Sequence, residues 1–132
     1  MKVEYVICTH GHYDHVSGNK TIKEDTGAKI VMSSITDVNC DVKVRDKEIL
    51  RVGNLEFKFF FTPGHTNDSM CILINDEKLI TGDTLYVGMI GGTSSIDDSK
   101  AQFDSLHQLM KLNEDIKVYP GHDFGVKPSS TI

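Results

Sequence analysis

The stretch Thr9-His10-Gly11-His12-Tyr13-Asp14-His15 contains three histidines and one aspartate within residues 10–15. It directly follows residues 3–8, an apolar segment with the character of a buried strand. Imidazole nitrogens and carboxylate oxygens are the usual protein ligands of zinc and similar divalent metals. The stretch therefore predicts a metal site at the end of a strand.

Three further polar segments also follow expected strands, and each contains one more potential ligand. Segment 62–66 contains His65, segment 81–84 contains Asp83, and segment 120–123 contains His122. Because strand ends are rigid points of a sheet, we expect all four polar segments to converge at one edge of the fold.

The spacing within the first segment indicates two metals. His10 and His12 are two positions apart, so in an extended loop both side chains point the same way. Asp14 and His15 are neighbours and are expected to point apart. One segment can thus serve two metals about 3.5 Å apart, which is the spacing in binuclear hydrolases.

Each metal needs ligands from later in the chain. We expect the first site to consist of His10, His12 and His65. We expect the second site to consist of Asp14, His15 and His122. Asp83 is placed to bridge the two metals, because one carboxylate has two oxygens.

The rest of the sequence alternates between expected strands and helices. The expected strands are 3–8, 28–32, 47–52, 55–61, 70–74, 78–81 and 116–119, and the expected helices are 17–26 and 99–112. Gly27 is placed to end the first helix, and Ser99 with Gln102 forms a capping box for the second. We expect segment 33–46 to be irregular, segment 82–98 to be a long glycine-rich loop, and residues 129–131 to be a solvated tail.

Composition narrows the class of protein. A chain of 132 residues fits one domain, and a net charge of -5 without clustered basic residues argues against nucleic acid and for a small-molecule substrate. The apolar runs are too short to span a membrane, and the N-terminus lacks the pattern of a signal peptide. Three cysteines without paired spacing form no disulfide framework, so a cytoplasmic location is expected.

The four polar segments, in this order, resemble the metallo-β-lactamase superfamily and in particular its glyoxalase II-type, hydroxyacylglutathione hydrolase-like enzymes. The matching segments are residues 9–15, 62–66, 81–84 and 120–123. The resemblance implies an αββα sandwich with two metals at one edge of its two sheets. Against that pattern, we expect residues 1–132 to be a single, partial domain that lacks the first strands and a C-terminal helical segment. We expect the missing strands to leave an exposed sheet edge that favours a homodimer.

The resemblance implies hydrolysis of a thioester, such as a hydroxyacylglutathione, by a metal-bound hydroxide. The cofactor would be two divalent metal ions, zinc in preference to iron or manganese, which lower the pKa of bound water toward about 7. Asp14 would hold the second metal and orient the hydroxide. Tyr13, Tyr86 and Met89 lie on loops beside the metals and are candidate substrate contacts. A leaving thiolate has a pKa of about 8.5, so no separate general acid is expected.

Two other functions stay open. Persulfide dioxygenases, which are iron-dependent relatives, also resemble the chain around residues 62–65 and 120–123, and they hold one iron with two histidines and one aspartate. Segment 88–95 lacks the arginine expected in their substrate loop, and the basic glutathione contacts of glyoxalase II are not evident. The third hypothesis is that the chain is a truncated domain that binds metal but has no enzymatic activity.

Overall fold

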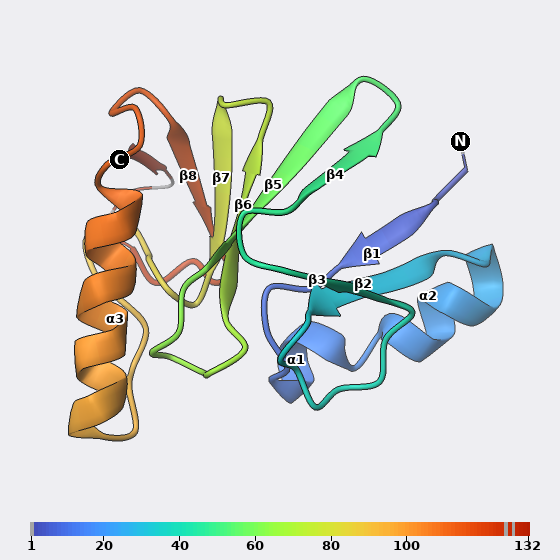
Figure 1. Cartoon of the computed structure of the whole chain (residues 1–132), viewed down its shortest axis with the longest axis horizontal. Helices are drawn as coiled ribbons and strands as arrows, with labels where there is room; N and C mark the ends of the chain where they lie inside the picture. Colours follow the sequence, from blue (N-terminus) through green and yellow to red (C-terminus); the bar gives the residue numbers. More distant parts are fainter. Residues whose placement is uncertain (1, 126, 128) are drawn as a thin grey trace.

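A three-stranded sheet and a six-stranded sheet pack face to face in a computed structural model that describes residues 2–125, 127 and 129–132 (Figure 1). The smaller sheet is parallel and consists of β1 (Tyr5–Ile7), β2 (Lys29–Ser33) and β3 (Val42–Val44). The larger sheet has the order β4 (Ile49–Val52), β5 (Leu55–Phe61), β6 (Met70–Ile74), β7 (Lys78–Gly82), β8 (Lys117–Pro120) and β9 (Ser130–Thr131). Helices α1 (Tyr13–Val16) and α2 (Asn19–Thr26) flank the smaller sheet, and α3 (Ile96–Leu109) flanks the larger one. The expected αββα sandwich is confirmed.

Alternating apolar side chains separate the four layers. In β5, Phe59 packs into the cluster between the two sheets, whereas the next residue, Phe60, packs into the cluster between the larger sheet and α3. In β2, Val31 faces the larger sheet, and Ile30 and Met32 face the other way, into a third cluster that includes part of α1. Successive residues of a strand point to opposite faces, so strands that are apolar on both faces can be buried on both.

Both expected hairpins of the larger sheet are confirmed. β4 pairs antiparallel with β5, and β6 pairs antiparallel with β7. Gly53 turns the first hairpin with φ 58°, and Asn75 and Asp76 turn the second with φ 50° and 55°. Asparagine and aspartate tolerate this left-handed region better than most residues. Gly27 ends α2 in the same region, with φ 73°, as its position predicted.

Three segments expected to be irregular contain regular structure, so those predictions were wrong. Segment 33–46 contains β3, the histidine-rich loop contains the four-residue helix α1, and the tail contains β9, which pairs with β8. Each of these elements is at most four residues long. Such short elements show no recognisable periodicity and are stabilised by tertiary partners rather than by local propensity.

Helix α3 begins earlier than expected, at Ile96 rather than at residue 99, and ends at Leu109. Its N-cap is Ser95, whose Oγ accepts a hydrogen bond from the Asp98 backbone amide at 3.0 Å. The expected cap of Ser99 with Gln102 was therefore wrong by one helical turn. A serine followed three residues later by an acidic residue is also a capping signature, and it occurs at residues 95–98.

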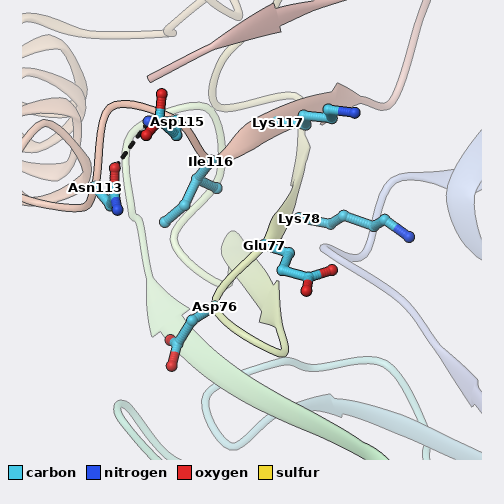
Figure 2. Close-up of a pocket in the computed structure, with 7 residues that line it drawn as sticks. All are labelled: Asp76, Glu77, Lys78, Asn113, Asp115, Ile116 and Lys117. Atoms are coloured by element: carbon cyan, nitrogen blue, oxygen red, sulfur yellow. Dashed lines mark hydrogen bonds between the residues drawn. The ribbon is translucent and has the colours of Figure 1, made fainter.

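The strand directions bring four strand ends to the same edge of the sandwich. β5 and β7 both run antiparallel to β6, and β8 runs parallel to β7. The segments that follow β5, β7 and β8 therefore emerge together, and the contact between His15 and His122 shows that the segment after β1 joins them. At the opposite end of β7 and β8 lies an open pocket of about 300 Å³, lined by residues 76–78, 113 and 115–117 (Figure 2). Among the described residues, no helix has the length and the apolar character needed to cross a membrane.

Candidate metal centre

Seven side chains from the four polar segments meet at this edge. They form three overlapping groups, and within each group the potential ligand atoms lie within 4.8 Å of one another. The groups are His10, His12 and His65; Asp14, His15 and His122; and His10, His15 and Asp83. His15 and His122 are in contact although 107 positions separate them in the chain. The structure thus brings together all the residues that the sequence analysis singled out as ligands.

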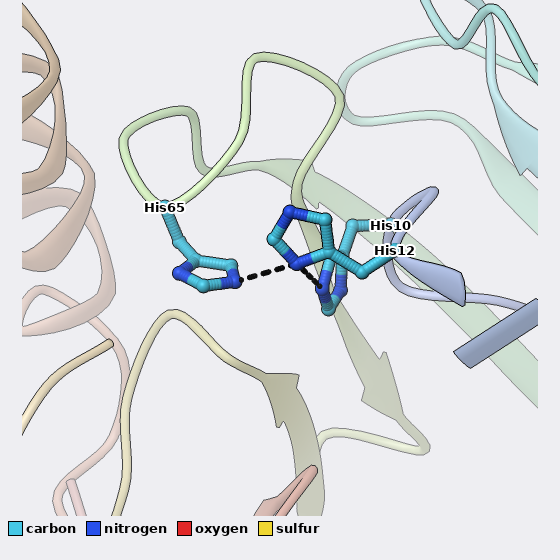
Figure 3. A group of neighbouring side chains, drawn as sticks. All are labelled: His10, His12 and His65. Carbon is cyan, nitrogen blue, oxygen red and sulfur yellow. Dashed lines mark hydrogen bonds between the residues drawn. The ribbon is translucent and has the colours of Figure 1, made fainter. Parts of the chain in front are cut away.

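The first group consists of three histidines whose ring nitrogens face one another (Figure 3). His12 Nδ1 lies 3.1 Å from His10 Nε2 and 3.0 Å from His65 Nε2. In a tetrahedral site with Zn–N bonds of about 2.0–2.1 Å, neighbouring ligand atoms lie about 3.3–3.4 Å apart. The nitrogen spacing of this group is therefore close to that of a zinc coordination shell.

The second group does not have the expected divergent geometry. Residues 13–16 form one turn of helix, and this turn directs both Asp14 and His15 toward His122. His122 Nε2 lies 3.2 Å from Asp14 Oδ2 and 3.3 Å from His15 Nε2, and His15 Nε2 lies 3.6 Å from Asp14 Oδ2. The prediction that Asp14 and His15 point apart was wrong, because the segment is helical there rather than extended. Asp14 and His15 nevertheless form a group with His122, as expected for the second site.

Asp83 lies between the two groups. Its Oδ2 is 3.5 Å from His65 Nε2 and 3.4 Å from His122 Nε2, and its Oδ1 is 3.3 Å from His15 Nε2. The side chain is 8% exposed, and Oδ1 accepts no hydrogen bond from any described residue. A buried acceptor without a partner costs about 1–3 kcal/mol. A cation beside the carboxylate would remove that cost.

Hydrogen bonds on the outer side of the rings prepare the histidines as ligands. His65 Nδ1 lies 2.8 Å from the carbonyl oxygen of Gly92, so Nδ1 carries the proton and Nε2 is free to face the group. His10 Nδ1 lies 3.1 Å from Thr9 Oγ1. Burial of His10, reinforced by the nearby His15, lowers its pKa from 6.5 to about 4. His10 is therefore neutral at physiological pH, which is the form that binds metal.

These observations fit a divalent metal centre. The donor set is nitrogen and carboxylate oxygen, the spacing suits first-row metals, and a buried carboxylate oxygen has no other partner. Histidine and carboxylate suit zinc, iron and manganese, so the donor set alone does not choose among these metals.

The predicted substrate contacts occupy different environments. Tyr13 lies in α1 and is 83% exposed, and Met89 lies in the loop after β7 and is 48% exposed. Tyr86 is buried, and its ring lies 6.3 Å from the ring of His122, centroid to centroid. Burial raises the pKa of Tyr86, and so does the neighbouring Asp83 carboxylate. Their contact with substrate stays a prediction.

Two residues beside the centre were missed by the sequence analysis. The ring of Phe124 stacks on His122 with the centroids 4.9 Å apart, and its position two residues after a ligand was an available signal. Gln102 of α3 donates and accepts hydrogen bonds with two of the polar segments. Nothing local in the sequence indicates this role, because its partners are backbone groups distant in the chain.

Comparison with known proteins agrees with this geometry. The family model of the metallo-beta-lactamase superfamily matches residues 1–122. The chain is 34% identical over 128 residues to a hydroxyacylglutathione hydrolase of Francisella tularensis subsp. novicida, covering 94% of this chain and 51% of that protein. It is 35% identical over 131 residues to a hydroxyacylglutathione hydrolase of Pelagibacter ubique, covering 94% of this chain and 53% of that protein.

A solved structure with a similar fold is that of ETHE1 from Myxococcus xanthus. The two superpose with a TM-score of 0.90 at 34% sequence identity, covering 99% of this chain and 59% of that one. The chain thus spans about half the length of the curated relatives that it matches. The family match over nearly the whole chain, the fold and the gathered ligand side chains agree: the chain belongs to the metallo-beta-lactamase superfamily.

Proposed function

We propose that the chain is the metal-binding part of a hydrolase that cleaves a thioester such as a hydroxyacylglutathione. The observation that supports this most directly is the position of Asp83, whose two carboxylate oxygens reach histidines of both ligand groups. A carboxylate placed between two ligand groups could contact both metals of a binuclear hydrolytic site, because it has two oxygens. The similarity to two hydroxyacylglutathione hydrolases supports the same reaction class.

Each ligand group has a distinct role in this proposal. His10, His12 and His65 would hold one metal, Asp14, His15 and His122 would hold the other, and Asp83 would contact both. Divalent metals held there would supply a water whose pKa is lowered to about 7 and would polarise a carbonyl oxygen.

Asp14 is the ligand carboxylate that lies on the solvent-exposed side of the site. Its side chain is 57% exposed, in contrast to the buried carboxylate of Asp83. Partial desolvation raises the pKa of Asp14, but the hydrogen bond from its backbone and the nearby His15 and His122 together lower that pKa by more. Asp14 is therefore ionised at neutral pH and can accept a hydrogen bond from the attacking water, which orients that water.

A thioester suits a site of this composition. The leaving thiolate is a weak base, so expulsion needs no strong proton donor. Tyr86, the buried phenol beside His122, has a raised pKa, so its hydroxyl stays protonated at neutral pH and can donate a hydrogen bond. No residue of the site needs to act as a general acid.

A second candidate is an iron-dependent dioxygenase that acts on a persulfide. The group of His10, His15 and Asp83 has the composition of the facial triad of two histidines and one carboxylate that binds non-haem iron. The similarity to ETHE1, a persulfide dioxygenase, favours this candidate as well. A domain that holds metal but turns over neither substrate is the third candidate.

Metal analysis and two assays distinguish the three. The protein is purified without added metal, its metal content is measured, and thioester hydrolysis and persulfide-dependent oxygen uptake are assayed in parallel. We expect two metals per chain and thioester hydrolysis, retained in His107→Asn because His107 lies outside the ligand groups. One iron with oxygen uptake supports the dioxygenase, and two bound metals with neither activity support the inactive domain. Either result would overturn the leading proposal.

A further inference from the structure

The face of α3 that covers the larger sheet carries a row of polar side chains. Gln102, Ser105 and Gln108 are three positions apart and therefore share one face of the helix. Gln108 Nε2 donates to the carbonyl of Phe61 at 3.3 Å, and Ser105 Oγ donates to the carbonyl of Pro63 at 2.8 Å. The row thus follows the backbone that leads from β5 toward the centre.

Gln102 is the member of this row at the centre itself. Its Oε1 accepts a hydrogen bond from the His65 backbone amide at 2.8 Å, and its Nε2 donates to the Thr84 carbonyl at 2.8 Å. Thr84 directly follows Asp83, so one side-chain amide joins the segment of a histidine ligand to the segment of the central carboxylate. The side chain is 1% exposed, and water does not compete for these bonds.

Gly64 permits this close approach. A Cβ atom at Gly64 would lie 2.5 Å from the Cα of Gln102, a distance at which the helix or the loop would have to move. Gly64 also has φ 146°, which side chains rarely adopt. The backbone beside His65 is therefore shaped around the amide of Gln102.

We propose that Gln102 is a positioning residue that fixes His65 relative to Asp83 in the metal centre. The proposal rests on the metal-binding part of the proposed function, and it does not depend on the substrate. A primary amide offers one acceptor and one donor in a single planar group. The His65 amide requires the acceptor and the Thr84 carbonyl requires the donor, so neither an apolar side chain nor a carboxylate satisfies both.

The test compares Gln102→Met with Gln108→Met. Both changes remove a hydrogen-bonding amide from the same row of α3 at similar volume, but Gln108 is half-buried and contacts only the carbonyl of Phe61 among the hydrogen bonds of its side chain, not a backbone group of a ligand or of its neighbour. Zn²⁺ affinities are measured by competition with a chromophoric chelator, and Co²⁺ spectra report the coordination geometry. Loss of a hydrogen-bonded support of a ligand lowers metal affinity about 10- to 100-fold. We expect a loss of that size and an altered Co²⁺ spectrum in Gln102→Met, and unchanged values in Gln108→Met.

Two outcomes overturn the proposal. One is native Zn²⁺ affinity in a folded Gln102→Met protein, and the other is equal weakening in both variants, which would indicate general loosening of α3. If circular dichroism shows that Gln102→Met does not fold, Gln102→Glu decides, since it keeps the acceptor for His65 and loses only the donor for Thr84. Native affinity and a native Co²⁺ spectrum in Gln102→Glu would also refute the role. Absence of thioester hydrolysis with these metal effects intact would count against the proposed function alone.

Discussion

Acidification should destabilise the metal-free protein through His10. This side chain is fully buried, and its pKa is lowered from 6.5 to about 4 by burial and then by the nearby His15. Between these two pH values the unfolded chain binds a proton at this position and the folded chain does not. The free energy of unfolding therefore falls as the pH falls through this window, and the stability is fully present above pH 6.5.

The size of the effect follows from the shift. One pKa unit corresponds to about 1.4 kcal/mol, so the lowered pKa of His10 corresponds to about 3 kcal/mol across the whole window. Of this, about 2 kcal/mol is lost between pH 7 and about 4.5. A domain of this size has a total stability of about 5–15 kcal/mol, so the loss is readily measured.

Urea unfolding of metal-free protein across this pH range tests the reasoning. His10→Asn removes the titrating ring and should flatten the pH dependence of the unfolding free energy by about 2 kcal/mol. The matched control is His107→Asn, because His107 is exposed on α3 and both its hydrogen bond, from Nδ1 to the Phe103 carbonyl at 2.9 Å, and its ring contact with Phe103 lie within its own helix. An identical pH dependence in His10→Asn and in the unaltered protein would refute the assignment.

Three further predictions concern the centre and the sheet edge. Asp83→Ala should abolish tight binding of both metals, whereas His122→Ala should mainly weaken the binding of one. Elemental analysis measures the metal content, and an unchanged content in Asp83→Ala would contradict the bridging position. Gly121→Ala should lower Zn²⁺ affinity about tenfold or more, because its Cβ would lie 2.6 Å from Asp83 Oδ1, while Gly92→Ala should not, since a Cβ there meets nothing within 4 Å. We propose that the edge of β1, which pairs with no described strand other than β2, supports a homodimer. Light scattering should then show a mass that rises with concentration, and a monomer at all concentrations would exclude the dimer.

The ligand set was readable from the sequence because each of the four ligand-bearing segments follows an apolar strand of its own. The apolar composition of the segments that end at Ile7 and Phe61 is enough to predict strands there. Asp83 and His122 could be predicted as ligands because their segments follow in the same order as in the family. The direction of Asp14 and His15 was not readable, because a single helical turn without a capping side chain leaves no pattern.

The role of Gln102 was hidden for a different reason. The sequence analysis treated this residue as part of a helix cap, whereas its partners lie 37 and 18 positions away and are backbone groups. A backbone amide or carbonyl has no identity in the sequence, so only the tertiary structure shows which one a side chain contacts. β9 was missed likewise, since its two residues are ordered by pairing with β8 rather than by their own propensity.

The division of the ligands between the two sheets has a consequence for folding. Four of the seven ligands follow β1 of the smaller sheet, and the other three follow strands of the larger sheet. Neither sheet alone can form a complete ligand group, and the contact between His15 and His122 closes a loop of 107 positions. Loop closure on this scale is an entropic cost that is met only when the sheets have docked. Metal binding should therefore select the docked state, slow the separation of the two sheets, and leave the early formation of the β5–β6–β7 meander unaffected.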